Sequence, residues 1–267
     1  YRYNQNEWGL TLALLEMKEV TQRFGGLIAL TDFSIAVEDH TLVGLIGPNG
    51  AGKTTVFNLA SGFYHATEGQ IIFNGQAYDT RLEPHQVTAM GMARTFQNIR
   101  LWNDMTVLDN ICVSQYHRLG YGLLDAWLNN ERYSREEKRV RQKALKILEI
   151  MELADVANEF PKNLPYGLQR RVELARALST DPKLLLLDEP AAGLNSSDVD
   201  GLIKHIRWIF DEFKIAIWMI EHQMKVVMSL CQHITVVEFG KTIAKGTPQE
   251  IQSNPEVIKA YLGDENV

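Results

Sequence analysis

The chain has 267 residues, of which 45% are hydrophobic, and its formal net charge is −6. This length fits one large domain or one domain with a subdomain, and the acidic balance argues against a general attraction to nucleic acid. Cys112 and Cys231 stand far apart in apolar surroundings, so no disulfide framework is indicated, and no apolar run approaches the roughly 20 residues of a transmembrane helix. Residues 1–13 show no clear period, and we expect a leader or tag that is disordered.

Strand-like patterns dominate the first part of the chain. Apolar and polar residues alternate over 14–24 and 29–39, which predicts an antiparallel hairpin with one face in water. Residues 41–47 are apolar on both faces, as is typical of a central parallel strand. Residues 53–62 are typical of a helix closed by a glycine, and residues 69–78 predict further strand structure with an Asn-Gly turn.

The pattern changes after about residue 97. Residues 125–153 predict a helix that is charged on one side, with apolar positions at Val140, Leu145, Leu148 and Met151. Two more buried strands and a terminal hairpin follow, at 182–190, 214–221 and 233–246. This alternation of strands and helices predicts an α/β fold with a helical insertion near 98–170.

The stretch GPNGAGKT follows the apolar strand and opens the next helix, which is the context that a phosphate-binding loop requires. The glycines let successive N–H groups point inward, Lys53 can reach the β and γ phosphates, and Thr54 offers a hydroxyl to Mg²⁺. A glycine-rich turn with a surface lysine is the simpler alternative. The nucleotide-binding residues that we expect here are Gly47, Pro48, Asn49, Gly50, Ala51, Gly52, Lys53, Thr54 and Thr55.

An acid pair, Asp188-Glu189, follows four leucines. A carboxylate at the C-terminal end of a buried strand in an open α/β sheet points into the ligand crevice. We assign Asp188 to holding a metal through water and Glu189 to positioning the attacking water. The alternative is a strand that simply ends in charges before Pro190.

Five further motifs stand in order along the chain: Phe24 in QRFGG, Gln97 in RTFQN, the stretch LPYGLQRRVELARAL (164–178), AAGLNSSD (191–198), and His222 in IEHQMKVV. With the phosphate loop and LLLLDEP, they make residues 14–263 resemble the nucleotide-binding subunit of an ATP-binding cassette (ABC) transporter. The resemblance implies a P-loop NTPase (RecA-like) core with an antiparallel β subdomain and an inserted helical subdomain. It divides the chain into 14–97, 98–170 and 171–267, the middle part ending in the signature motif.

The resemblance also implies a role for each matched residue, with ATP and Mg²⁺ as cofactors. Phe24 would stack on adenine, while Tyr166 and Gly167 of the signature would serve the ATP of a partner protomer. The expected catalytic residues are Glu189, His222, Lys53 and Gln97, and His222 stabilises the γ phosphate. The expected metal-binding residues are Thr54, Gln97 and Asp188.

The implied partners are a second ABC ATPase, in a homodimer or heterodimer that sandwiches two ATP molecules, and two integral-membrane permease subunits. A periplasmic or extracellular solute-binding protein would be an indirect partner, through the permeases. No binding to nucleic acid is expected. These partners would hold the chain peripherally at the cytoplasmic face of a bacterial inner membrane.

Three positions depart from the family pattern. Pro165 stands at the usual signature serine, Leu168 at the usual glutamine, and Asn195 where many members carry aspartate. Pro165 removes a hydroxyl and a backbone N–H, and we expect hydrolysis to survive on the remaining helix-terminal N–H groups.

Longer stretches, among them FGGLIALTDFS and the ending GTPQEIQSNPEVIKAYLG, resemble the larger of the paired ATPases in bacterial high-affinity branched-chain amino acid importers. Importers of urea or short amides are an alternative. The other readings are an ABC protein without a transporter that acts on nucleic acid or ribosomes, a regulatory clamp that does not hydrolyse ATP, and a small-molecule P-loop kinase. A small-molecule P-loop kinase would not need the signature motif or His222, which argues against that alternative.

Overall fold

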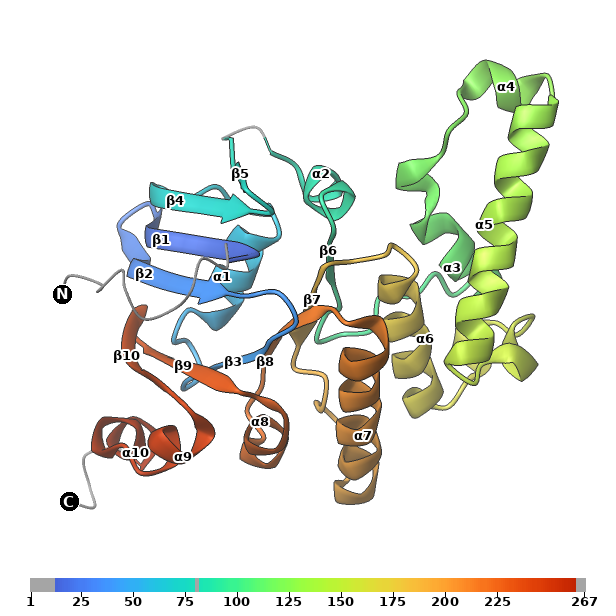
Figure 1. Ribbon diagram of the computed structural model, residues 1–267. Coiled ribbons are helices and arrows are strands. Elements are labelled where there is room, and N and C mark those ends of the chain that lie inside the picture. Colours follow the sequence, from blue (N-terminus) through green and yellow to red (C-terminus); the bar gives the residue numbers. More distant parts are fainter. Residues whose placement is uncertain (1–12, 80–81, 263–267) are drawn as a thin grey trace.

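Two β-sheets organise the chain in the computed structural model, which describes residues 13–79 and 82–262 (Figure 1). Apart from residue 13, the predicted leader lies outside the described residues. The four-stranded sheet has the order β2-β1-β4-β5 and is antiparallel. Its strands are β1 (Leu15–Phe24), β2 (Leu27–Val37), β4 (Glu68–Phe73) and β5 (Gln76–Ala77). The predicted hairpin of β1 and β2 is therefore confirmed.

The six-stranded sheet has the order β10-β9-β3-β8-β7-β6 and is parallel except for the β9–β10 hairpin. All residues of β3, β7 and β8 are buried, which explains their continuous apolar sequences. The strands are β3 (Leu42–Ile46), β6 (Met92–Arg94), β7 (Leu184–Asp188), β8 (Ala216–Ile220), β9 (His233–Glu238) and β10 (Lys241–Gly246). The predicted central strand is β3, between β9 and β8.

Helices cover both faces of this sheet. Side chains alternate along β3, so Leu42 and Ile46 enter the core shared with α7 and the helical insertion, whereas Val43 and Leu45 enter the core shared with α1 and the antiparallel sheet. The helices outside the insertion are α1 (Lys53–Ala60), α2 (Pro84–Ala89), α7 (Ser196–Phe213), α8 (Met224–Leu230), α9 (Pro248–Gln252) and α10 (Pro255–Leu262). No helix in the described ranges is both long enough and apolar enough to cross a membrane.

The helical insertion stands beside the sheets, with α6 between the six-stranded sheet and α5 (Figure 1). Its elements are α3 (Val107–Ser114), η1 (Tyr116–Arg118), α4 (Leu123–Trp127), α5 (Glu131–Ile150), η2 (Ala154–Val156), η3 (Pro161–Asn163) and α6 (Tyr166–Leu178). The boundary that we predicted at residue 170 falls inside α6. The division into domains stays a prediction.

The buried face of α5 differs in one position from the predicted one. Val140, Leu148 and Met151 are buried as expected, but Leu145 is 44% exposed. The helix instead buries Ala144 and Ile147, which lie four and seven residues after Val140. Leu145 is rotated away from this stripe, so the prediction was wrong there.

Candidate nucleotide-binding site

The loop between β3 and α1 depends on glycine conformations. Gly47, Gly50 and Gly52 have φ angles of 152°, 79° and 100°, a region that other residues rarely adopt. A Cβ atom on Gly47 would lie 2.0 Å from the backbone oxygen of Val237 on β9. The loop therefore needs glycine at position 47 both for its conformation and for its contact with the neighbouring strand.

Replacing Gly47 with alanine is expected to lower the free energy of unfolding by about 3 kcal/mol or more, because backbone must move to admit the methyl group. Gly50→Ala is the matched control, since it has a positive φ but no atom within 4 Å of the added Cβ. It should cost only about 1–2 kcal/mol of backbone strain. Denaturant unfolding measures both, and equal costs would contradict the steric argument.

Lys53 closes the loop from the first turn of α1. Its ammonium group donates to the backbone oxygens of Gly47 at 2.7 Å and Pro48 at 2.8 Å. Burial lowers the pKa of Lys53, and the nearby carboxylates of Glu189 and Asp188 partly oppose that shift. The structure thus holds a desolvated cation beside the curled backbone, which is suited to binding phosphate oxygens.

A cavity of about 480 Å³ opens above this loop. The predicted residues Phe24, Glu189 and His222 line it together with the loop, from Asn49 to Thr55. Phe24 is 40% exposed, and its ring lies 5.1 Å from that of Tyr64 at an interplanar angle of 72°, so part of the Phe24 side chain is available to a planar ring. Sequence reasoning missed the rest of the lining, from the two hairpins: Leu27, Ile28, Ala29, Phe239 and Gly240.

Glu189 directly follows β7 and has a φ of 48°, which is unusual for a residue other than glycine. Its Oε2 accepts a hydrogen bond from Gln97 Nε2 at 2.6 Å, and its Oε1 lies 2.8 Å from His222 Nε2. The contact with a carboxylate oxygen requires the proton of the imidazole on Nε2. The structure therefore brings three of the four predicted catalytic residues into direct contact.

Glu221, which sequence reasoning missed, joins the two loops that carry Glu189 and His222. Its carboxylate is buried and accepts from the backbone N–H groups of Ala191 at 2.7 Å, His222 at 2.9 Å and Gln223 at 3.1 Å. The side-chain amide of Gln223 donates in turn to the Ala191 oxygen at 3.1 Å. Ala191 is thus clamped through both its N–H and its C=O.

Asp188 is buried and pairs with Arg94, whose Nη2 lies 2.7 Å from Asp188 Oδ2. Arg94 also donates to Asn58 at 2.8 Å and Ser61 at 3.0 Å, and its guanidinium lies 5.0 Å from the Phe96 ring centroid. Burial lowers the pKa of Arg94, whereas Asp188 acts in the opposite direction. The charge of Asp188 is therefore balanced by Arg94 of the same chain. The two residues are 94 positions apart in the sequence.

Comparisons with known proteins agree with this geometry. Residues 30–192 match the ABC transporter family, and residues 241–266 match a family described as branched-chain amino acid ATP-binding cassette transporter. The chain is 43% identical over 251 residues to the high-affinity branched-chain amino acid transport ATP-binding protein BraF of Pseudomonas aeruginosa, covering 94% of this chain and 98% of BraF. It is 42% identical over the same length to LivG of Escherichia coli, with the same coverage.

The chain belongs to the ABC transporter family. It is an ATPase of that family. A crystal structure of an ATP-binding cassette of an ABC transporter in its ADP conformation superposes with a TM-score of 0.81 at 31% identity, covering 95% of this chain and all of that one. The predicted fold class, a P-loop NTPase core with an antiparallel sheet and a helical insertion, is confirmed.

Six predicted residues do not line the cavity. Gly47, Pro48, Gln97 and Asp188 contact or adjoin residues that do, whereas the two signature residues of this ABC ATPase lie elsewhere. Tyr166 and Gly167 begin α6, and neither lines the 480 Å³ cavity. The Tyr166 hydroxyl donates to the Ala192 oxygen at 3.1 Å, and a Cβ on Gly167 would meet open space. The start of α6 is therefore attached to the loop after β7 and leaves Gly167 accessible.

Proposed function

We propose that this ABC ATPase powers a membrane importer for branched-chain or other amino acids. The observation that supports the solute class is the 43% identity, over nearly the full length of both chains, with a protein named for branched-chain amino acid transport. The match of residues 241–266 to the branched-chain family supports the same choice. Urea or short amides remain the alternative solutes to be tested.

The proposed hydrolysis uses the contacts around Glu189. Its carboxylate orients the attacking water and accepts its proton, while Gln97 and His222 fix the two oxygens. In the ATP-bound state the Nε2–H of His222 would turn from Glu189 to the γ phosphate, and Gln97 would keep its hydrogen bond to the Glu189 carboxylate. The ammonium of Lys53 offsets the negative charge that develops on the phosphates.

The residues that would hold Mg²⁺ are Thr54, Gln97 and Asp188. A hydroxyl, an amide oxygen and a carboxylate fit this ion, which prefers oxygen ligands. Thr54 is exposed in the first turn of α1, whereas Asp188 is buried and would act through a water molecule. An ion held by these residues would offset negative charge on the phosphates of ATP.

A dimer completes the proposed site. The accessible backbone at Gly167 would approach the γ phosphate bound by a partner protomer, and the N-terminus of α6 favours negative charge. The partner is a second copy or a second ABC ATPase. Two permease subunits, and through them a solute-binding protein, would place the pair at the cytoplasmic face of the membrane.

Two measurements test the proposal. Labelled ATP with Mg²⁺ should bind the purified chain, and Lys53→Ala should weaken that binding at least about 100-fold, because it removes the charge that reaches the phosphates. Vesicles carrying the chain with its permeases should accumulate leucine on addition of ATP. Nucleotide binding with uptake of urea but not of leucine would refute the amino-acid assignment, and failure to bind ATP would refute the ATPase site.

A further inference from the structure

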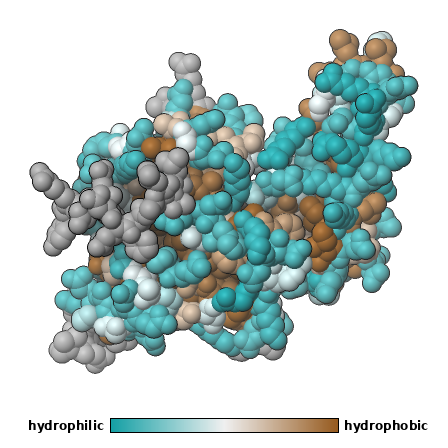
Figure 2. All heavy atoms as spheres, in the orientation of Figure 1, coloured by the Kyte–Doolittle hydropathy of each residue, from teal (hydrophilic) through white to brown (hydrophobic). Residues whose placement is uncertain are grey.

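The tip of the helical insertion presents apolar side chains to solvent. Four residues in and just after α4 are far more exposed than is usual for their type: Leu123 at 92%, Leu124 at 74%, Trp127 at 81% and Leu128 at 64%. Their spacing puts them on one side of the short helix. Figure 2 shows hydrophobic atoms at this outer end, above a flank that is mostly hydrophilic.

The polar side of α4 holds this tip against α5. Asp125 accepts from the backbone N–H of Gly122 at 2.9 Å and from the side chain of Asn130 at 2.7 Å. Asn130 in turn caps α5 by accepting from the Tyr133 N–H at 3.0 Å. The bond between Asp125 and Asn130 therefore ties the polar side of α4 to the start of α5, and the four apolar side chains face solvent.

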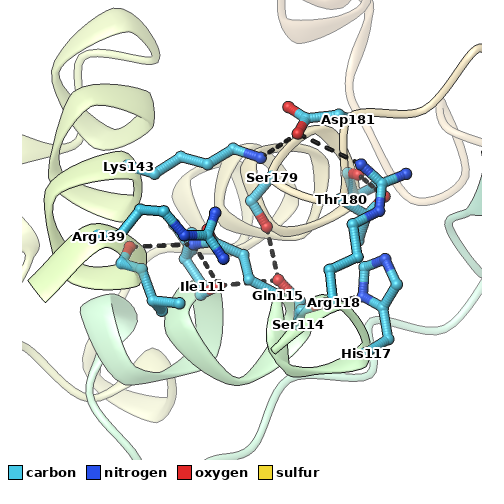
Figure 3. A network of polar contacts seen from close by, with 12 residues as sticks. Ile111, Ser114, Gln115, His117, Arg118, Arg139, Lys143, Ser179, Thr180 and Asp181 are labelled. Carbon is cyan, nitrogen blue, oxygen red and sulfur yellow. Dashed lines mark hydrogen bonds and ion pairs between the residues drawn. The ribbon is translucent and has the colours of Figure 1, made fainter. Parts of the chain in front are cut away.

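The base of the insertion is anchored as well. Lys143 and Arg118 both point toward Asp181, which follows α6, and each forms an ion pair with it (Figure 3). The hydroxyls of Ser114 and Ser179 lie 2.5 Å apart and link α3 to the end of α6. The protrusion therefore presents its tip from an anchored support.

Basic side chains surround the start of α5. Arg132, Arg135 and Lys138 are exposed, and within the described residues none of them forms an ion pair. The nearby acids are engaged, because Glu136 pairs with Arg139 and Glu137 accepts from Tyr121 at 2.6 Å. Arg132 interacts electrostatically with Asp125 and Glu136, so the cations are partly compensated. Over the whole of α5, seven Lys and Arg residues stand against four Glu, in a chain whose net charge is −6.

We propose that this tip inserts into the headgroup region of an anionic lipid bilayer. Leucines and a tryptophan would enter the interface, and Arg132 and Arg135 would contact lipid phosphates, the arrangement of interfacial membrane anchors. Four apolar side chains at a protruding tip are far fewer than the roughly 20–30 residues that each partner contributes to a stable protein interface, which favours lipid over a protein partner. The contact would need neither nucleotide nor solute, and so goes beyond the proposed function.

Flotation of the full chain with vesicles tests this proposal. The protein should float with vesicles containing phosphatidylglycerol and much less with phosphatidylcholine alone, and added salt should weaken the binding. The Leu124→Ser/Trp127→Gln double variant should bind at least about tenfold more weakly. Leu145→Ser, a change to an exposed leucine on the body of α5, is the matched control and should bind normally.

Charge and insertion are measured separately. Arg132→Gln/Arg135→Gln should reduce both the binding and its salt dependence, and the blue shift of tryptophan emission on vesicle addition should be lost in Trp127→Gln. ATP hydrolysis in solution should be unchanged in all these variants, which separates the test from the proposed function. Equal flotation of wild type and the double variant, binding only when permeases are present, or a change in self-association alone would overturn the proposal.

Discussion

Replacing Glu189 with glutamine is expected to leave ATP binding intact and to lower the hydrolysis rate at least about 100-fold, the scale of general-base catalysis. Glutamine keeps the size of the side chain but cannot accept a proton from water. One of its two contacts also changes character, because an NH₂ group would face either Gln97 or His222, where the carboxylate accepts from both.

Equilibrium ATP binding and steady-state turnover, measured on the dimer or the membrane complex, check this prediction. Glu149→Gln, at an exposed position of α5, controls for the loss of one negative charge. Turnover within a fewfold of wild type would show that Glu189 is not the general base. A loss of binding and turnover together would instead show that Glu189 supports the pocket.

Glu221→Gln is expected to lower kcat roughly tenfold to 100-fold, with a small change in ATP affinity. The two carboxylate oxygens accept three backbone N–H groups, whereas the amide offers one accepting oxygen. Its NH₂ group would face either Ala191 or His222 and Gln223, and a lost buried hydrogen bond costs about 1–3 kcal/mol. The loop after β7 and the loop of His222 would lose their common anchor.

Three readouts distinguish this positioning role from general destabilisation. Single-turnover hydrolysis at saturating ATP should be slower than in wild type. The dissociation constant for ATP should be close to that of wild type, and thermal unfolding should show that the variant is folded. Gln223→Ala should be less than additive with Glu221→Gln, because both side chains hold Ala191. Glu212→Gln, exposed at the end of α7, is the control. A kcat equal to that of wild type would contradict the role.

The phosphate loop and Glu189 could be predicted from short stretches of sequence. The phosphate loop is contiguous, its glycines have the conformations that only glycine adopts readily, and the strand before it and the helix after it follow from residue periodicity. Glu189 was predictable from its place at the end of a leucine strand. The assignment of roles to Gln97 and His222 came from family resemblance, since neither residue has a local pattern that marks it.

The contacts that sequence did not predict join distant parts of the chain. Arg94 meets Asp188 because β6 and β7 are neighbours in the sheet, and Glu221 meets Ala191 because β8 lies beside β7. Such contacts depend on strand order, which alternation of strands and helices leaves open. Leu145 was misplaced for a different reason: the predicted stripe consisted of large apolar residues, whereas the helix buries the small Ala144 and leaves Leu145 exposed.

The ion pair between Arg94 and Asp188 bears on how the protein can be handled. A buried carboxylate without a counter-charge would destabilise the fold, and in many metal sites the ion itself supplies that charge. Here the chain supplies it, at 2.7 Å. We therefore expect the fold not to depend on magnesium, and chelators such as EDTA should remove the proposed ion without unfolding the protein.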